Sequence, residues 1–376
     1  MRSMLPLIGR STPSRLMMNN AKEVSGLVKT RKLFITASLL ILFIGAAVCY
    51  DRMPSPAEKA GLPLELSAWL ADWQWQNGLE NLEVLKEGLT SLQMFAAYFD
   101  QTDSLYFTDD YDEAMPEVLK LFEQSGLDHV YLTVVNDQIL PSGESRQKDP
   151  ELITRLMSSE ESRRRHADEL IAAAEQYGFG GVELDYERVA EEDWDKVLLF
   201  ISDLYSRLKD KGKSLRVVLE TRAKIEQLKM PEGPDYVMMA YNLYGFHSGP
   251  GPKADHAFIK QLTSRMAYLP GKPYIAFSVG GFDWQEAGKA TALTEVQASN
   301  LAKQKGSTVR RDQASGSVYF DYTDEDQVKH TVWYADEKTL LQWIEIAQQA
   351  DINKVAIWRL GEMQISSLDL LKQQAG

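Results

Sequence analysis

Short apolar runs alternate with longer amphipathic runs along most of the chain beyond residue 63. The short runs are rich in β-branched and aromatic residues, which favours strands, and helical segments separate most of them. The expected strands are Leu66–Trp73, Leu92–Phe99, His129–Val135, Gly180–Tyr186, Leu215–Glu220, Tyr236–Tyr241, Tyr274–Val279 and Lys354–Leu360. Eight such units within about 300 residues predict an α/β fold, a single TIM (β/α)8 barrel over residues 64–372.

Two of the expected helices have clear end signals. Asp149 can cap a helix whose first turn contains Pro150. Another helix begins among the acids at 191–193 and ends in lysines followed by Gly212, which suits the helix dipole and a left-handed C-cap.

The gap between strands seven and eight is too long for a simple crossover. Residues 282–336 contain a helical run near Thr294–Lys305, followed by the alternating stretches GSTVRRD, GSVYFDY and HTVWYAD. This pattern predicts a small α+β insertion on the carboxyl-terminal rim of the barrel.

A charge-free apolar segment at residues 33–50 precedes the barrel. As a helix, eighteen residues would span roughly 27 Å, which is close to the hydrocarbon core of a bilayer. Residues 1–32 contain seven basic side chains and one acidic side chain, so their net charge is +6. Because basic segments that flank a membrane span stay in the cytoplasm, residues 1–32 are predicted to form a cytoplasmic arm. We therefore expect a single-pass protein of the cell membrane, with 51–63 as a linker and the barrel outside. A cleaved signal segment and a secreted barrel are the alternative.

Composition adds two limits. The chain has a formal net charge of −13, which leaves −19 after residue 32, and so acidic a surface argues against a nucleic-acid partner. The only cysteine, Cys49, lies in the apolar segment. The exported part therefore has no disulfide, and its stability depends on its core.

The stretch GFGGVELDYERV places Glu183, Asp185 and Glu187 at alternate positions of an expected strand. In a barrel, alternate residues face the lumen, and active sites lie at the carboxyl ends of the strands. Three carboxylates confined there should raise the pKa of at least one, as a general acid at neutral pH requires. The alternative is an edge strand with a solvated acidic face, which the flanking glycines and the β/α series disfavour.

These residues resemble glycoside hydrolase family 18, the chitinase-like enzymes. GGVELDYE resembles the family's fourth-strand pattern D-G-x-D-x-D-x-E, YVMMAYN its sixth-strand M-x-Y-D, and KVAIWRLG its eighth strand. Roughly residues 90–365 are similar, most specifically to a bacterial branch, the YaaH-related spore-cortex and cell-wall lytic N-acetylglucosaminidases. The LysM repeats of many branch members are absent.

The resemblance implies a role for each matching residue. Glu187 matches the catalytic acid, Asp185 and Tyr241 match the residues that hold the substrate's acetamide, and Trp358 matches the floor of the sugar site. The implied reaction is a retaining hydrolysis in which the acetamide, rather than an enzyme group, attacks the anomeric carbon.

Two positions in the expected substrate site depart from the family pattern. Glu183 is one methylene longer than the usual Asp, long enough to crowd Asp185 or change how the two share a proton. Asn242 replaces an Asp and loses a charge while keeping hydrogen bonds. These differences bear on rate and pH optimum more than on reaction class.

Aromatic residues near predicted strand ends could stack on sugars, but core packing explains any one of them equally well. Of these aromatic residues, we expect only Trp358, Tyr98 and Tyr244 to contact substrate, and we expect Glu183 and Asn242 to contact it as well. The histidines are scattered, so we expect no metal, and no motif indicates a cofactor.

Two hypotheses follow. The first is a membrane-anchored glycosidase, expected to be a monomer, that acts on glycan containing N-acetylglucosamine, either peptidoglycan or chitin-like. The second is a carbohydrate-binding or scaffold protein of the cell envelope on the same barrel. Retention of Glu187, Asp185 and Tyr241 favours the enzyme, and the sequence leaves the polymer and endo or exo cleavage open.

Overall fold

The computed structural model describes residues 63–125 and 129–375. The predicted basic arm at 1–32, the apolar segment at 33–50 and nearly all of the linker at 51–63 lie outside these residues, so their roles stay predictions. Among the helices that are described, none is both long and apolar enough to cross a membrane.

Eight parallel strands of the described chain close into a barrel, as the sequence predicts. β1 pairs with both β2 and β15, and β2 pairs with β4, so the sheet has no open edge. The barrel strands are β1 (Glu65–Ala71), β2 (Ser91–Phe99), β4 (Val130–Ile139), β6 (Gly181–Asp185), β7 (Ser214–Leu219), β8 (Asp235–Met239), β9 (Tyr274–Phe277) and β15 (Lys354–Leu360). Two short strands, β3 (Leu105–Tyr106) and β5 (Ser145–Arg146), extend β2 and β4 as antiparallel hairpins.

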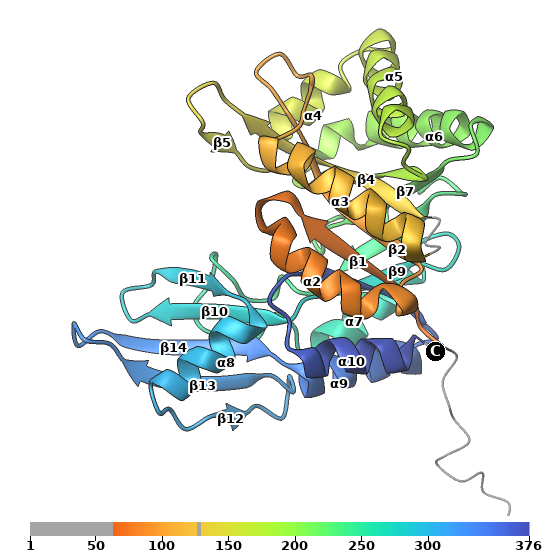
Figure 1. The fold of residues 1–376 in the computed structure, drawn as a ribbon. Helices are drawn as coiled ribbons and strands as arrows, with labels where there is room; N and C mark the ends of the chain where they lie inside the picture. The colour runs from red at the N-terminus through yellow and green to blue at the C-terminus, as the bar shows by residue number, and fades with distance from the viewer. Residues whose placement is uncertain (1–62, 126–128, 376) are drawn as a thin grey trace, which may run out of the picture. The chain divides into compact units, whose positions relative to one another are not determined.

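Helices cover the outside of the barrel (Figure 1). They are α2 (Trp75–Leu85), α3 (Asp109–Ser125), α4 (Pro150–Leu156), α5 (Glu160–Gln176), α6 (Trp194–Asp210), α7 (His256–Met266), α9 (Glu337–Gln349) and α10 (Ile365–Gln374). Both predicted helix ends are confirmed. The Asp149 side chain accepts a hydrogen bond from the Glu151 amide at the start of α4, and Gly212 after α6 has a φ of 69°. β7 and β8 are joined by residues 220–234 without a helix.

The barrel strands separate two apolar layers. Side chains such as Val182, Leu184 and Tyr186 belong to the large outer core between strands and helices. Trp69, Phe95 and Val237 belong to a smaller cluster inside the lumen, against which Tyr241 and Trp358 pack. Because strand residues alternate between these layers, the polar residues between Val182 and Tyr186 face the lumen.

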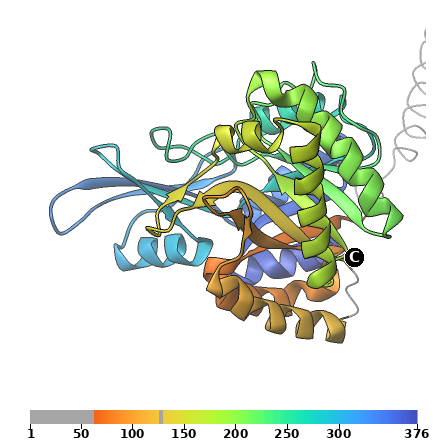
Figure 2. The ribbon, with the colours of Figure 1, turned by 90° about the horizontal axis from the view of Figure 1, so that it is seen from above.

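The predicted insertion between β9 and β15 is confirmed, and it begins at residue 280 rather than 282. It is an antiparallel sheet in the order β11-β10-β14-β13-β12, with α8 (Glu295–Gln304) packed on β10 and β14. Its strands are β10 (Gly280–Gln285), β11 (Ala290–Leu293), β12 (Arg310–Arg311), β13 (Val318–Thr323) and β14 (Lys329–Ala335). Figures 1 and 2 show this sheet extending to one side of the barrel.

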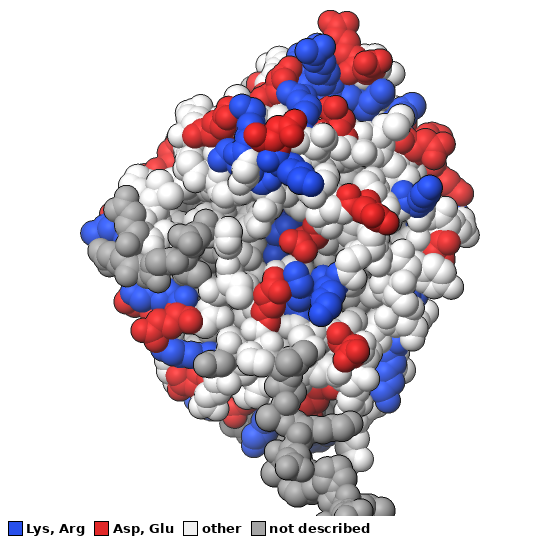
Figure 3. All heavy atoms as spheres, turned by 90° about the vertical axis from the view of Figure 1, so that its right-hand side faces the viewer, with Lys and Arg blue, Asp and Glu red and all other residues white. Residues whose placement is uncertain are grey.

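Charged residues of both signs mix on the face in Figure 3. Lys and Arg side chains lie among Asp and Glu side chains there, without a broad area of one sign. That face offers no extended basic surface of the kind that binds a polyanion.

Candidate active site

Glu183 and Asp185 lie on β6 and Glu187 follows it, all three rising toward the carboxyl end of the barrel. Glu183 and Asp185 are buried, and both contact residues of other strands or loops rather than bulk solvent. The lumenal orientation predicted from their alternation is confirmed, and the alternative of a solvated edge strand is wrong.

Glu183 has a different role from the predicted one. Its carboxylate is fully buried and accepts hydrogen bonds from Trp69 Nε1 at 2.6 Å and Thr133 Oγ1 at 2.8 Å. Arg216 Nε donates to its second oxygen at 2.8 Å, because the register of β6 and β7 sets the two residues side by side. Both oxygens are therefore engaged below the cleft, and the expectation that Glu183 contacts substrate is corrected.

Arg216 is the buried cation that the sequence analysis missed. Its side chain is 1% exposed, and its guanidinium lies 4.5 Å from the ring centroid of Tyr274 and 5.8 Å from that of Tyr131. A single arginine inside the apolar strand LRVVL was the available signal, since a buried charge needs a counter-ion.

The Asp185 carboxyl is buried, and its Oδ2 lies 3.7 Å from Lys148 Nζ. Burial raises its pKa to about 7; the Lys148 ammonium opposes that rise, while Glu187, Glu183 and Asp137 add to it. Its Oδ1 is buried and has no hydrogen-bond partner within the described part of the chain. The predicted rise of a carboxyl pKa is confirmed, with burial as its largest cause.

Lys148 joins the carboxylates, and nothing in the sequence pattern indicated it. It follows β5 in a left-handed backbone conformation with a φ of 54°, and its amide donates to Asp137 Oδ1 at 2.8 Å. Its Nζ lies 3.0 Å from Glu187 Oε1 and 3.7 Å from Asp185 Oδ2. Burial opposes the charge, but Asp185, Glu187 and Asp137 together raise the Lys148 pKa above its ordinary value.

Asn136 fixes the backbone at Glu187. Its Oδ1 accepts from the Glu187 amide at 2.9 Å, and its Nδ2 donates to the Glu187 carbonyl at 2.9 Å. The Asn136 side chain is fully buried on β4, so it holds both the amide and the carbonyl of Glu187. This contact joins residues 51 positions apart, which no local pattern indicates.

Tyr241 and Trp358 form the apolar floor beside the carboxylates. Their rings are nearly parallel, with centroids 6.5 Å apart, and Trp358 meets Phe95 edge-on at 4.7 Å. Burial and then the charges of Asp185 and Glu187 raise the Tyr241 pKa well above its ordinary value, so its hydroxyl stays a donor.

A cavity of about 400 Å³ brings most predicted site residues together. It is lined by Glu187, Tyr241, Asn242, Tyr244 and Trp358, and also by Phe246 and Phe282, which the sequence analysis missed. Phe246 is 68% exposed and meets Phe282 of the insertion edge-on at 4.8 Å, so the insertion forms one wall.

Tyr98 lies apart from this cavity. It is 7% exposed, and its hydroxyl donates to Asp72 Oδ1 at 3.0 Å. The structure thus places Tyr98 in packing beneath the rim, because the buried Asp72 takes its hydroxyl, and it does not support the predicted substrate contact.

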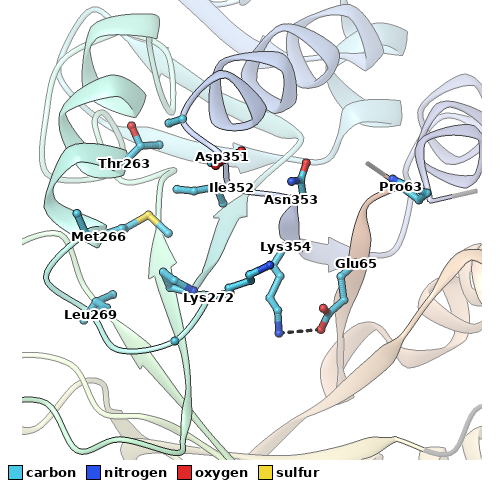
Figure 4. Close-up of a pocket in the computed structure, with 14 residues that line it drawn as sticks. Pro63, Glu65, Thr263, Met266, Leu269, Lys272, Asp351, Ile352, Asn353 and Lys354 are labelled. Carbon is cyan, nitrogen blue, oxygen red and sulfur yellow. Dashed lines mark ion pairs between the residues drawn. The ribbon is translucent and has the colours of Figure 1, made fainter. Parts of the chain in front are cut away.

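A further pocket of about 350 Å³ lies at the opposite end of the barrel. Glu65 and Lys354, the first residues of β1 and β15, form an ion pair of 3.1 Å across it (Figure 4). In this fold the amino ends of the strands serve stability rather than chemistry, so this pocket is not the candidate site.

Known proteins resemble this chain in both sequence and fold. The uncharacterized glycosylase YvbX of Bacillus subtilis (strain 168) is 27% identical over 228 residues, 57% of this chain and 66% of that protein. The cortical fragment-lytic enzyme of Bacillus anthracis is 27% identical over 215 residues, 51% of this chain and 49% of that protein. The matches therefore span between about half and two thirds of these relatives.

Solved structures share the fold at lower identity. The spore cortex-lytic enzyme SleL of Bacillus cereus superposes with a TM-score of 0.71 at 18% identity, over 84% of this chain and 75% of that one. A chitinase from Chromobacterium violaceum ATCC 12472 superposes with a TM-score of 0.70 at 18% identity, over 83% of this chain and 98% of that one. The family model for glycosyl hydrolases family 18 matches residues 87–362, which include every strand of the barrel after β1, and so this chain is a member of glycosyl hydrolase family 18.

Proposed function

We propose that this glycoside hydrolase cleaves β-linked glycan containing N-acetylglucosamine, either peptidoglycan or a chitin-like polymer, with retention and with help from the substrate's own acetamide. The observation behind this proposal is the unpartnered Oδ1 of Asp185, buried beside Glu187 and below Tyr241. An acetamide N–H would give that oxygen the hydrogen bond it lacks.

In the first step, the acetamide oxygen bonds to the anomeric carbon while the bond to the leaving oxygen breaks. Glu187 gives its proton to that oxygen, and an oxazolinium ion forms. Water then attacks the anomeric carbon, its proton passes to Glu187, and the ring opens to regenerate the acetamide with net retention. Asp185 and the Tyr241 hydroxyl orient the acetamide, and Trp358 stacks under the sugar.

The proton supply follows from the electrostatics of the pair. Lys148 Nζ lies 3.0 Å from Glu187 Oε1, and the first step needs the acid form of Glu187. Asp185 holds a proton up to about pH 7, and Lys148 Nζ lies within 4.0 Å of both carboxylates. Asp185 can therefore pass its proton to Glu187 when the glycan displaces water.

The ion pair between Lys148 and Glu187 also favours a second candidate, a non-catalytic glycan-binding protein of the envelope. In such a protein, the contact with Lys148 would position Glu187 without preparing it to act as an acid. The relatives named as cortical fragment-lytic enzymes and chitinases favour turnover.

Turnover by the purified chain, on peptidoglycan and on chitin oligomers with products identified by mass, separates the two candidates. Glu187→Gln keeps the size and removes the acid, so the rate should fall about 10²–10⁴-fold while sugar binding persists. Glu192→Gln, at an exposed position after β6, is the matched control and should keep the wild-type rate. Full activity in Glu187→Gln would end the catalytic assignment, and a wild type inert on both polymers would favour the binding protein.

A further inference from the structure

A second cavity continues the cleft beyond Trp358. It has a volume of about 490 Å³ and lies between the ends of β1, β9 and β15 and the start of the insertion. Trp358, Phe246, Phe282 and Lys253 line both this cavity and the one that contains Glu187. The two cavities therefore adjoin at these four residues, on either side of Trp358.

Lys253 enters this cavity without a counter-ion. Its Nζ donates to Ser278 Oγ at 2.8 Å and to the Val279 carbonyl at 3.1 Å, and it lies 5.5 Å from the Phe282 ring centroid. No carboxylate oxygen of the described residues lies within 4.0 Å of it. Burial and then the nearby Arg359 charge lower its pKa to about 7, which reflects how poorly the ammonium is compensated.

Arg359 is the second cation of the cavity. Its guanidinium lies 5.3 Å from the Trp73 ring centroid and donates to Gln74 Oε1. It too has no carboxylate oxygen within 4.0 Å among the residues described. Burial lowers its pKa, and only Glu362, at longer range, opposes that fall.

Two acids adjoin these cations, Glu295 in the lining of the cavity and Glu362 beside it, and both accept hydrogen bonds from other groups. Glu295 accepts from the Gln364 amide at 3.0 Å and from Ser367 Oγ at 2.7 Å, and burial raises its pKa to about 7. Glu362 accepts from Thr294 at 3.1 Å and from Gln297 at 2.8 Å. The two cationic groups, Lys253 and Arg359, therefore share one partly desolvated cavity. Their charged forms are unfavourable there, and a bound anion would stabilise them.

The remaining walls suit a sugar. Trp73 is 50% exposed and Phe246 is 68% exposed, and exposed aromatic rings of this kind stack on the apolar faces of pyranose rings. The cavity thus combines stacking surfaces with two unpaired cations.

We propose that this cavity is a subsite for an acidic sugar, in which Lys253 and Arg359 bind a carboxylate borne by the glycan. In peptidoglycan that carboxylate is either the lactyl group of a peptide-free N-acetylmuramic acid or the terminal carboxylate of a short peptide attached to it. The inference rests on the proposed function, because it selects acidic peptidoglycan over neutral chitin as the substrate of the same cleft.

Calorimetric binding to the Glu187→Gln chain tests it without turnover. The probes are a peptide-free tetrasaccharide of alternating N-acetylglucosamine and N-acetylmuramic acid, the same tetrasaccharide with single alanine stubs, the methyl ester of each, and chitotetraose. At least one acid should bind about 10-fold or more tightly than its own ester, since charge-assisted hydrogen bonds are the strong ones. Which acid shows the difference identifies the source of the carboxylate.

Substitutions then locate the charge. Lys253→Met and Arg359→Met should each bring the ratio of acid to ester affinity toward one, whereas Lys260→Met, exposed on α7, should keep the parent ratio. If a variant fails to fold, the comparison of acid and ester binding to the Glu187→Gln chain, whose second cavity is unaltered, still tests the subsite. Equal binding of acids and esters would overturn the subsite, even if peptidoglycan and chitin are both cleaved. An acid preference in a chain that cleaves neither polymer would support the subsite and contradict the proposed function.

Discussion

The buried ion pair between Glu183 and Arg216 allows a direct test of how the lumen is stabilised. Glu183→Gln keeps the volume and leaves one oxygen to accept from Trp69 and Thr133. In the wild type, Arg216 Nε donates to a Glu183 carboxylate oxygen at 2.8 Å. In the variant, the glutamine NH2 group takes the place of that oxygen, so two donors face each other. Arg216 would keep its charge at 1% exposure with only Ser67, at 3.4 Å, and tyrosine rings near it.

Leaving one buried charge unpaired typically costs about 3–5 kcal/mol. We expect the free energy of unfolding of Glu183→Gln to fall by that amount, measured by urea titration with tryptophan fluorescence. Glu191→Gln is the matched control, because it breaks a pair of similar length, 2.8 Å, whose side chains are 77% and 55% exposed. Exposed pairs contribute about 1 kcal/mol or less, so the control should lose little.

A second substitution separates the charge from the loss of packing. Adding Arg216→Met removes the stranded cation, so the double variant should be more stable than the sum of the two single losses predicts. Losses that simply add, or a loss in Glu183→Gln as small as that of the control, would refute the view that this pair neutralises the lumen.

Two further predictions concern titration in the cleft. Because burial raises the folded-state pKa of Asp185 to about 7 from an ordinary 3.8, its stabilising contribution is present below about pH 4 and lost as the pH rises to about 7. The wild type should lose up to about 4 kcal/mol more than Asp185→Asn across that range in urea titrations, and parallel curves would contradict this. Lys148→Met removes the charge that lowers the Asp185 pKa, so the alkaline limb of kcat/KM should move up by about one pH unit. Arg146→Met, exposed on β5, should leave that limb in place, and an unmoved limb in Lys148→Met would exclude the coupling.

The sequence predicted the barrel well because its signals are local. The barrel strands are short apolar runs, and helices such as α4 and α7 begin at a capping aspartate, so neighbouring residues suffice to predict them. The hairpin strands Leu105–Tyr106 and Ser145–Arg146 were missed because two residues show no period. They matter nonetheless, since the second of them leads directly into Lys148.

The site was predicted in part, for a related reason. Alternation along one strand placed Asp185 and Glu187 in the lumen, and the resemblance to family 18 supplied Tyr241 and Trp358. The groups that set their charge come from elsewhere in the chain: Lys148 from a loop and Arg216 from the next strand. Distances of that kind follow from loop paths and strand register, which a periodic pattern does not contain.

Three acids that look equivalent in the sequence thus meet three different environments. Arg216 neutralises Glu183 at the base of the lumen, burial keeps a proton on Asp185, and Lys148 faces Glu187 at the mouth. Two cations, Lys253 and Arg359, line the second cavity, and among the described residues neither has a carboxylate oxygen within 4.0 Å. A glycan that bears a carboxylate therefore complements the second cavity, as an unsubstituted chitin chain does not.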